Sequence, residues 1–316
     1  MDDQALARIA PELVLAGWSR PVESARPLGG GMNSATALVD LVDERAVLKW
    51  VRDPVALAAG CDAAQRLARH GLRTGQPFPT TAGNLIHPAE DGAVALLRFV
   101  PGRELSPNDP DDQRDMALTL AAVHATEATP RSGTFLSDEI AELVHDVEPW
   151  VRPTVDLVLD EYARLPALTW SLLHADPESG AFLRHPDTGQ VGLIDWTATR
   201  FGPVLYDVAS ALMYLGGRHQ ADAFWAAYLS RSPAPVTELT AHLGTFTRYR
   251  AAVQAAYFSM RIGTRDRTGI VDDGENWKGL RDAERMLRTN GAEMVTQTSP
   301  PRTHSGDPEG AEVRPG

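Results

Sequence analysis

The sequence predicts an α+β protein in which an N-terminal antiparallel sheet precedes a mostly helical chain. Residues 22–51 divide into three strand-like apolar runs, separated by a glycine-rich segment and a charged turn. Residues 84–100 contain two more such runs on either side of Glu90-Asp91-Gly92, which is typical of a hairpin turn. Beyond residue 110 the apolar residues recur with the spacing of helices. These three observations together predict a sheet of five strands followed by helices.

Local signals place the individual elements. The first helix is expected over residues 3–16, where Asp2 or Asp3 can cap its start. A second helix should start at Asp53-Pro54, because Asp is a good cap and proline fits the first helical position. The strands are expected over residues 22–28, 35–41, 46–51, 84–87 and 93–100. Further helices are expected after residues 110 and 203, and over residues 136–164, 219–230, 236–262 and 276–287.

The length of 316 residues is compatible with two domains. We expect an N-terminal domain over residues 1–100 and a second, mostly helical domain over residues 101–295. From residue 296 to 316 Pro, Ser, Gly and charged residues dominate without an apolar period, which predicts a disordered tail.

The composition argues against several classes of protein. The net charge is −12, whereas nucleic acid and anionic membranes attract clustered positive surfaces, so we expect neither partner. No apolar run approaches the roughly 20 residues that span a bilayer, and the acidic start of the chain lacks a signal-peptide pattern. The single cysteine, Cys61, excludes an intrachain disulfide. A cytoplasmic protein is expected, and the sequence leaves its oligomeric state open.

Two aspartates, Asp176 and Asp195, each follow directly after an apolar, strand-like run. Between them lies the turn sequence Pro186-Asp187-Thr188-Gly189, so the segments on either side should form a hairpin that folds Asp195 back toward Asp176. Two carboxylates in one cleft can divide the work of phosphoryl transfer, because one can accept a proton while the other holds a divalent cation.

A glycine run and a lysine lie in the predicted sheet. The segment between the first two strands contains residues that could hold a phosphate: Gly29, Gly30, Gly31, Asn33 and Ser34. A plain hairpin turn is the alternative. Lys49 and Lys278 are the only lysines, and Lys49 lies in the third strand. It either contacts nucleotide phosphates or faces water on an edge strand, and its position after the glycines favours the phosphates.

The segment HADPESGAF, followed by LIDW, resembles the catalytic loop and metal-binding segment of the aminoglycoside phosphotransferases and their protein-kinase-like relatives. The pattern of that family is H-G-D-x-x-x-x-N, then I-D-W or I-D-F. The resemblance implies a bilobal protein-kinase-like fold with the nucleotide between the lobes. Residues 1–100 would be the nucleotide-binding lobe, and residues 101–295 the catalytic and acceptor-binding lobe. Asp176 would be the catalytic aspartate, and Asp195 would lie on magnesium. Ala181 replaces the family's metal-site Asn, and Glu178 or Ser179 is the nearest substitute.

The same resemblance assigns further residues. The strand that ends before Pro101-Gly102 resembles the family's hinge, which places Phe99 and Val100 at the adenine-binding edge. Tyr206-Asp207 resembles the family's Y-D segment, so Asp207 should brace the catalytic loop through backbone hydrogen bonds. The segment L-A-A-V-H ends in His124, which we interpret as structural. In the family, the second helix carries a Glu that pairs with the strand lysine. In this chain Asp62 is the only acid in that helix, and it either pairs with Lys49 or lies in solvent.

The resemblance implies transfer of the γ-phosphoryl group of ATP or GTP, with Mg²⁺, to a hydroxyl of a small-molecule antibiotic, in resistance or in self-protection of a producer. A metabolic kinase acting on a sugar, an amino alcohol or homoserine would share every motif and is the first alternative. A catalytically silent nucleotide-binding protein is the second, because Ala181 and the missing helix Glu depart from the family pattern.

Overall fold

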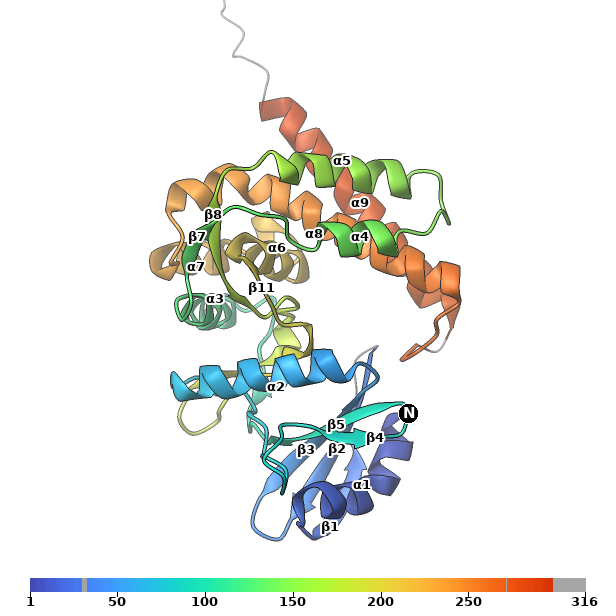
Figure 1. Cartoon of the computed structure of the whole chain (residues 1–316). Coiled ribbons are helices and arrows are strands. Elements are labelled where there is room, and N and C mark those ends of the chain that lie inside the picture. The colour runs from blue at the N-terminus through green and yellow to red at the C-terminus, as the bar shows by residue number, and fades with distance from the viewer. Residues whose placement is uncertain (30–32, 271, 298–316) are drawn as a thin grey trace, which may run out of the picture.

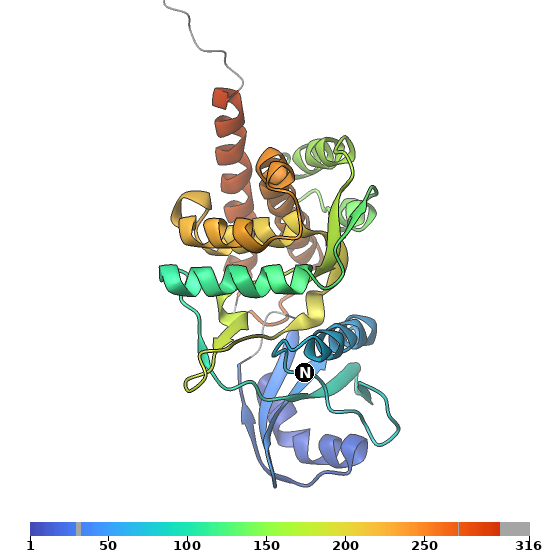
Figure 2. The same cartoon turned by 90° about the vertical axis from the view of Figure 1, so that its left-hand side faces the viewer.

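The computed structural model describes residues 1–29, 33–270 and 272–297, and of residues 289–297 the backbone alone. Figure 1 shows a part built on a sheet at the bottom and a larger, mostly helical part above it, with α2 (Pro54–Arg69) between them. The view in Figure 2, turned by 90°, shows the same stacking of the two parts. The predicted α+β, bilobal architecture is therefore confirmed. Residue 100 remains our proposal for the boundary between the two parts.

The N-terminal part is a five-stranded antiparallel sheet with the strand order β1-β2-β3-β5-β4. Its strands are β1 (Val22–Pro27), β2 (Ser34–Leu41), β3 (Arg45–Val51), β4 (His87–Ala89) and β5 (Gly92–Arg98). The first helix, α1 (Asp3–Trp18), packs against β1 and β2. Its start is capped by the Asp2 side chain, which accepts a hydrogen bond from the Ala5 N–H at 2.7 Å. The prediction of five antiparallel strands is confirmed, although the fourth strand begins only at His87, where the predicted range of residues 84–87 ends.

The two faces of β3 are covered by different helices. Leu48 and Trp50 belong to the apolar cluster that α1 covers. Because side chains alternate along a strand, Lys49 lies on the opposite face with Val51, which packs against α2. The Asp53 side chain caps α2 by accepting a hydrogen bond from the Val55 N–H at 2.9 Å. The alternation of β3 thus directs its lysine toward α2 and the helical part.

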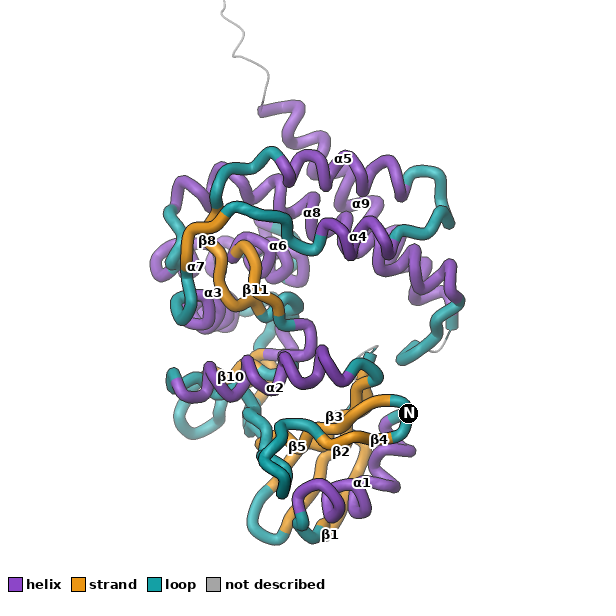
Figure 3. The backbone as a smooth tube through the Cα atoms, viewed as in Figure 1, coloured by secondary structure: helices purple, strands orange, loops and turns teal. Residues whose placement is uncertain are grey.

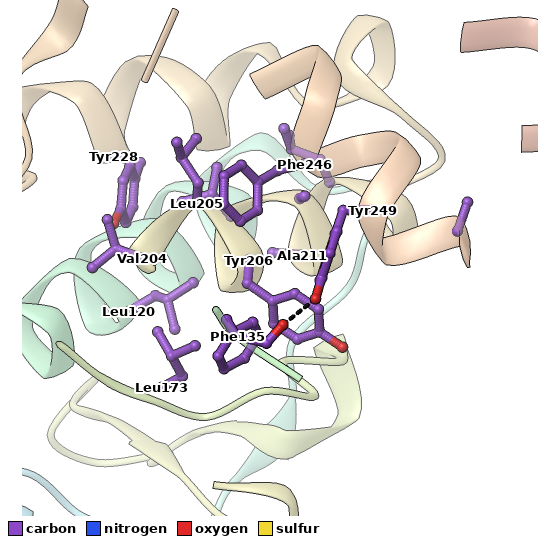
Figure 4. Close-up of a cluster of buried hydrophobic side chains, with 14 of the residues drawn as sticks. Leu120, Phe135, Leu173, Val204, Leu205, Tyr206, Ala211, Tyr228, Phe246 and Tyr249 are labelled. Carbon is purple, nitrogen blue, oxygen red and sulfur yellow. Dashed lines mark hydrogen bonds between the residues drawn. The ribbon is translucent and has the colours of Figure 1, made fainter. Parts of the chain in front are cut away.

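The helical part is organised around a long helix, α8 (Val236–Thr264), which contacts α4, α5, α6 and α9. The other helices of this part are α3 (Pro110–His124), α4 (Ser137–Leu143), α5 (Val151–Ala163), α6 (Val204–Tyr214), α7 (Asp222–Arg231) and α9 (Asp273–Gln297). Figure 4 shows aromatic side chains between α6 and α8, where the Tyr249 hydroxyl donates a hydrogen bond to the Phe135 carbonyl oxygen. This packing fixes α6 and α8 relative to each other.

Two small antiparallel sheets connect the helices. One has the order β10-β9-β6 and the other the order β11-β8-β7. Their strands are β6 (Arg103–Glu104), β7 (Thr129–Arg131), β8 (Leu168–Leu173), β9 (Phe182–Arg184), β10 (Val191–Leu193) and β11 (Arg200–Pro203). Figure 3 shows β8 and β11 as strands within the otherwise helical part. The predicted hairpin is present, because β9 pairs with β10. β6, β7 and β11 were not predicted, since such short strands carry too little alternation.

The last helix differs from its prediction. α9 begins at Asp273 and continues to Gln297, whereas the sequence predicted a helix over residues 276–287 and a tail from residue 296. The rest of that predicted tail, residues 298–316, lies outside the described residues. None of the described helices combines the length and the apolar character that a membrane-spanning segment needs.

Candidate active site

Lys49 of β3 and Asp195, which directly precedes the turn η2 (Trp196–Ala198), form an ion pair between the two parts of the molecule. Lys49 Nζ lies 2.5 Å from Asp195 Oδ1, and the lysine side chain is 6% exposed. β3 lies between β2 and β5, so the alternative of a water-facing lysine on an edge strand is wrong. Both residues line a cavity of about 390 Å³ whose wall comes from the sheet, α2, β6 and the segment around β9 and η2.

The charge of Asp195 is maintained by its surroundings. Burial by itself would raise the pKa of this carboxyl group, but the Lys49 ammonium and the hydrogen bonds from Lys49 and Thr197 together hold the pKa of Asp195 below its ordinary value. Asp195 Oδ1 also accepts a hydrogen bond from the Thr197 hydroxyl at 3.2 Å. The side chain is 51% exposed, so the carboxylate remains accessible from the cavity. A charged, accessible carboxylate of this kind can accept a cation.

The loop that carries Asp176 is held by a buried carboxylate. Asp207 Oδ2 accepts a hydrogen bond from the His174 N–H, and Asp207 Oδ1 accepts one from the Ala175 N–H, both at 2.7 Å. His124 Nε2 lies 3.0 Å from Asp207 Oδ2, and both of these side chains are fully buried. The prediction that Asp207 braces this loop through backbone hydrogen bonds is confirmed, and His124 has a structural position behind it.

Ala175, directly before Asp176, has an unusual backbone conformation. Its φ is +68°, in the left-handed region that glycine adopts most easily. The family pattern H-G-D has glycine at this place, whereas this chain has Ala175. The two Asp207 hydrogen bonds therefore hold a strained residue immediately before Asp176.

Asp176 has partners from two helices. The Tyr214 hydroxyl at the end of α6 donates a hydrogen bond to Asp176 Oδ1. Arg250 of α8 lies with its Nη2 atom 3.8 Å from the same oxygen. The Asp176 side chain is 53% exposed, whereas Arg250 is 11% exposed. Asp176 is thus open on one side and held by a phenol and a guanidinium on the other.

Several carboxylates surround Glu178. Burial raises the pKa of Glu178, and the negative charges of Asp176, Glu104 and Asp195 raise it further. Asp176 and Asp195 therefore act on the same side chain, which fits the prediction that the hairpin turns Asp195 back toward Asp176. The Ala181 side chain packs on the apolar core of the helical part, so it contributes nothing to the polar group.

The fit of this group to magnesium follows from its donors. Within the described ranges, no group of three or more His, Cys, Asp or Glu side chains is arranged to hold a metal ion. Magnesium, however, is usually bound by one or two carboxylates together with substrate phosphates. The charged oxygen atoms of Asp195, with Glu178 nearby, match that requirement, and Glu178 as the substitute for the family Asn stays a prediction.

The glycine segment contributes to the cavity wall. Gly29 and Ser34 line the cavity, and Gly29 has a φ of +90°. Gly30 and Gly31 lie outside the described residues. Asn33 does not line the cavity, because its side-chain amide donates a hydrogen bond to the Tyr257 hydroxyl of α8 at 3.0 Å. Its predicted contact with a phosphate is thus a proposal that the present geometry does not favour.

The predicted hinge also lines the cavity. Phe99 and Val100 follow β5 and line the cavity, as does Gly102. Glu104 of β6 lines it as well and lies beside Gly180, with Oε2 3.7 Å from where a Cβ at Gly180 would be. The segment after β5 thus gives the cavity both an apolar edge and a carboxylate.

α2 approaches the Asp195 segment closely but supplies no acid to Lys49. Asp62 forms an ion pair with Arg66 at 3.0 Å and is 56% exposed, so the solvated position, and not the pairing with Lys49, is the observed one. A Cβ at Gly60 would lie 2.6 Å from the Trp196 carbonyl oxygen. Cys61 lines the cavity, and burial raises the pKa of its thiol to about 12 against the opposing effect of Lys49. This thiol is therefore a neutral, small apolar group.

Tyr214, Arg250 and Glu104 were not found by sequence reasoning. Tyr214 and Arg250 lie far along the chain from Asp176, and only the packing of α6 and α8 brings them to it. One signal was available for Arg250. It lies in a helix with many apolar residues, where a guanidinium needs a carboxylate partner. The sequence did not indicate which carboxylate that would be.

The fold and the site define a class of protein in which a sheet-borne lysine meets an aspartate in a cavity, next to a second aspartate on a braced loop. Residues 24–239 match the model of the phosphotransferase enzyme family, APH, which covers more than half of the chain. The chain belongs to this family, and the resemblance found in its sequence is confirmed. A search of the curated proteins finds no match.

Solved structures share the fold. A microcompartment-associated aminopropanol kinase has 19% identity and a TM-score of 0.67, and the match covers 92% of this chain and 98% of that chain. Spectinomycin phosphotransferase APH(9)-Ia has 14% identity and a TM-score of 0.65, with 90% and 98% covered. Choline kinase LicA from Streptococcus pneumoniae has 14% identity and a TM-score of 0.67, with 90% and 100% covered. At these identities the likeness establishes the fold alone.

Proposed function

We propose that this protein is a cytoplasmic kinase that transfers the γ-phosphoryl group of ATP or GTP to a hydroxyl of a small-molecule antibiotic. The observation that carries the proposal is the Lys49–Asp195 pair in a cavity between the sheet and the helical part. The Lys49 ammonium and the Asp195 carboxylate lie there at hydrogen-bond distance. Phosphoryl transfer needs a cation that contacts the phosphates and an anion that holds the accompanying divalent cation, and these two residues could fill those roles.

The roles of the residues follow from their places. Phe99 and Val100 offer an apolar edge for a purine, and Lys49 with Gly29 and Ser34 lies where the phosphates would enter the cavity. Asp176, whose side chain is 53% exposed, would orient the acceptor hydroxyl and receive its proton. As the hydroxyl oxygen bonds to the γ-phosphorus, the bond to the bridging oxygen breaks, and the nucleoside diphosphate leaves with those electrons.

Asp195 and Glu178 would hold Mg²⁺, which when bound neutralises charge on the phosphate oxygens. Glu178→Ala tests whether Glu178 replaces the Asn that Ala181 lacks. The magnesium concentration that gives half-maximal nucleotide binding should rise, and an unchanged value would remove Glu178 from this role. Ala181→Asn is the complementary variant, because it restores the amide of the family pattern without changing a charge.

The proposed antibiotic kinase and the alternative, a metabolic kinase, differ in the class of acceptor that they phosphorylate. Two relatives in fold are an amicoumacin kinase and a spectinomycin phosphotransferase, which favours an antibiotic. The aminopropanol and choline kinases have the same fold and support the alternative of a metabolic small-molecule kinase. A panel of both kinds of acceptor, with product detection by mass spectrometry, decides between them. Phosphorylation confined to amino alcohols or sugars would overturn the antibiotic assignment.

Nucleotide binding is tested by calorimetry with ATP or GTP and magnesium. Loss of a charge-assisted contact of about 1.5–3 kcal/mol in Lys49→Ala should weaken binding by roughly 10–100-fold. Lys278→Ala is the matched control, because Lys278 is the only other lysine, is 74% exposed and pairs with Asp282 outside the cavity. It should bind nucleotide as the wild type does. No saturable heat with the wild type would refute the proposal.

The chemical step is tested with Asp176→Asn. This variant should bind nucleotide normally and lose turnover by about 10²–10⁴-fold, the usual contribution of a general base. The alternative of a catalytically silent binding protein would be supported if the wild type binds nucleotide saturably but neither phosphorylates any acceptor nor hydrolyses the nucleotide.

A further inference from the structure

Tyr214 and Arg250 converge on a single oxygen of Asp176. The Tyr214 hydroxyl donates to Asp176 Oδ1, and Arg250 Nη2 lies 3.8 Å from that oxygen. Neither residue belongs to the loop that carries Asp176. Asp176 Oδ2 has no hydrogen-bond partner among the described side chains and backbone groups. The two carboxylate oxygens are therefore unequal, one held from the helices and the other open.

Arg250 is fixed in this place by its own contacts. Its Nε donates to the Ser210 hydroxyl oxygen at 3.1 Å, and its Nη2 donates to the Tyr214 hydroxyl oxygen at 3.4 Å. The Ser210 hydroxyl in turn donates to the Tyr206 carbonyl oxygen at 2.8 Å. The side chain is 11% exposed, so the guanidinium has little freedom to move. α6 and α8 together make a rigid frame behind Asp176.

The charge of Arg250 points to the same conclusion. A guanidinium that is mostly removed from water needs a carboxylate partner. In the part of the chain that the structure describes, the carboxylate within ion-pair distance of Arg250 is Asp176. Other buried arginines of this helix have different partners, since Arg248 is paired with Glu161. Arg250 is thus paired with the predicted catalytic aspartate, whereas Arg248 is not.

We propose that Tyr214 and Arg250 are positioning residues for the phosphoryl acceptor site. They hold Asp176 Oδ1, so that Oδ2 is the oxygen that hydrogen-bonds the acceptor hydroxyl. This inference rests on the proposed kinase function. A carboxylate can otherwise rotate about its terminal bond, a torsion with broad minima. Fixing one oxygen restricts this rotation, and misplacement of a reacting group by about 1 Å can cost roughly 10²-fold in rate.

The test compares Tyr214→Phe, Arg250→Gln and Arg250→Lys with the wild type. Tyr214→Phe removes only the donor, and its kcat should fall by about tenfold. Arg250→Gln should lower kcat by about 10²-fold, and Arg250→Lys should recover part of that loss because it restores a cation. The dissociation constant for nucleotide, measured by calorimetry, should change by less than about twofold in all three. Loss confined to kcat is the result that a general loss of structure would not produce.

Arg248→Gln is the matched control. Arg248 lies two positions before Arg250 in α8, its side chain is 10% exposed, and its Nε lies 3.0 Å from Glu161 Oε2. This variant should lose stability but retain kcat, because Glu161 does not contact Asp176. Equal losses of kcat in Arg248→Gln and Arg250→Gln would overturn the proposal, as would a kcat within about twofold of wild type in both Tyr214→Phe and Arg250→Gln.

The proposal can fail independently of the proposed function. Hydrolysis of the nucleotide with water as the acceptor gives the same comparison without a known substrate, and the same falls in rate are expected. If the variants transfer phosphoryl groups as fast as the wild type does, only the positioning roles are refuted. Absence of nucleotide binding by the wild type would refute the kinase function itself, and the positioning roles with it.

Discussion

Asp207→Asn should both destabilise the protein and slow its reaction. Asp207 accepts the N–H groups of His174 and Ala175 at 2.7 Å each, and His124 Nε2 lies 3.0 Å away. Asn has the same shape but keeps one acceptor oxygen, so one backbone N–H would face an NH₂ group. The lost charge-assisted hydrogen bond costs about 1.5–3 kcal/mol and the unsatisfied buried donor about 1–3 kcal/mol. We expect a total loss of about 3–5 kcal/mol.

The free energy of unfolding is measured by urea titration with tryptophan fluorescence. Trp196 reports on this site, because its ring centroid lies 4.7 Å from that of His174. The control is Asp222→Asn at the start of α7, where the side chain is 82% exposed and pairs with Arg218, so the change should stay within about 0.5 kcal/mol. A loss below about 1 kcal/mol for Asp207→Asn, with kcat unchanged, would refute the bracing role.

Three further changes test the neighbourhood of the site. Gly60→Ala places a Cβ 2.6 Å from the Trp196 carbonyl oxygen, so thermal unfolding should show a loss of about 1–3 kcal/mol; no loss would contradict the tight packing. Ala175→Gly relieves a left-handed conformation at φ +68° that costs about 1–2 kcal/mol, while the greater backbone entropy of glycine costs about 0.5–1 kcal/mol. Urea unfolding should therefore show a net gain in the free energy of unfolding of about 0.5–1 kcal/mol. A loss would argue against strain at this residue. The hydrogen bond from Arg103 lowers the pKa of buried Asp112 below 3.8, so the stability that the Asp112 carboxylate contributes is present above that value and is lost as pH falls through the folded pKa. The stability difference between wild type and Asp112→Asn should therefore shrink between about pH 6 and about pH 2. A constant difference would contradict the lowered pKa.

The sequence was sufficient for those parts of the fold that depend on local pattern. The five strands of the N-terminal sheet and the hairpin of β9 and β10 have enough alternation or turn sequence to be predicted. β6, β7 and β11 of the two small sheets were missed, since a strand such as β6, with only Arg103 and Glu104, has no measurable period. The far end of α9 was missed because its polar residues near the C-terminus resemble those of a tail.

The site divides along the same line. The turn sequence between the two aspartates predicted that Asp195 folds back toward Asp176, and the position of Lys49 after the glycines predicted a phosphate contact. The ion pair of Lys49 with Asp195 was not predicted, since the only acid considered for it was Asp62. Tyr214 and Arg250 meet Asp176 only because α6 packs against α8, and that packing depends on the shapes of buried aromatic side chains. Pattern in a sequence carries the period of a helix, but not the rotation and depth at which one helix lies against another.

The Lys49–Asp195 pair also accounts for the missing helix acid. A mostly buried ammonium must have a counter-charge, and in this chain the counter-charge comes from the Asp195 segment at 2.5 Å, while Asp62 of α2 lies in solvent. α2 instead presents Gly60 to the backbone of Trp196, where a Cβ would lie 2.6 Å from the carbonyl oxygen, so the absence of a side chain lets the helix approach the segment closely. A nucleotide with its divalent cation would bring an anion for Lys49 and a cation for Asp195. Lys49 could then exchange the Asp195 carboxylate for a phosphate, and Asp195 could exchange the Lys49 ammonium for the divalent cation. Neither charge would be left unpaired.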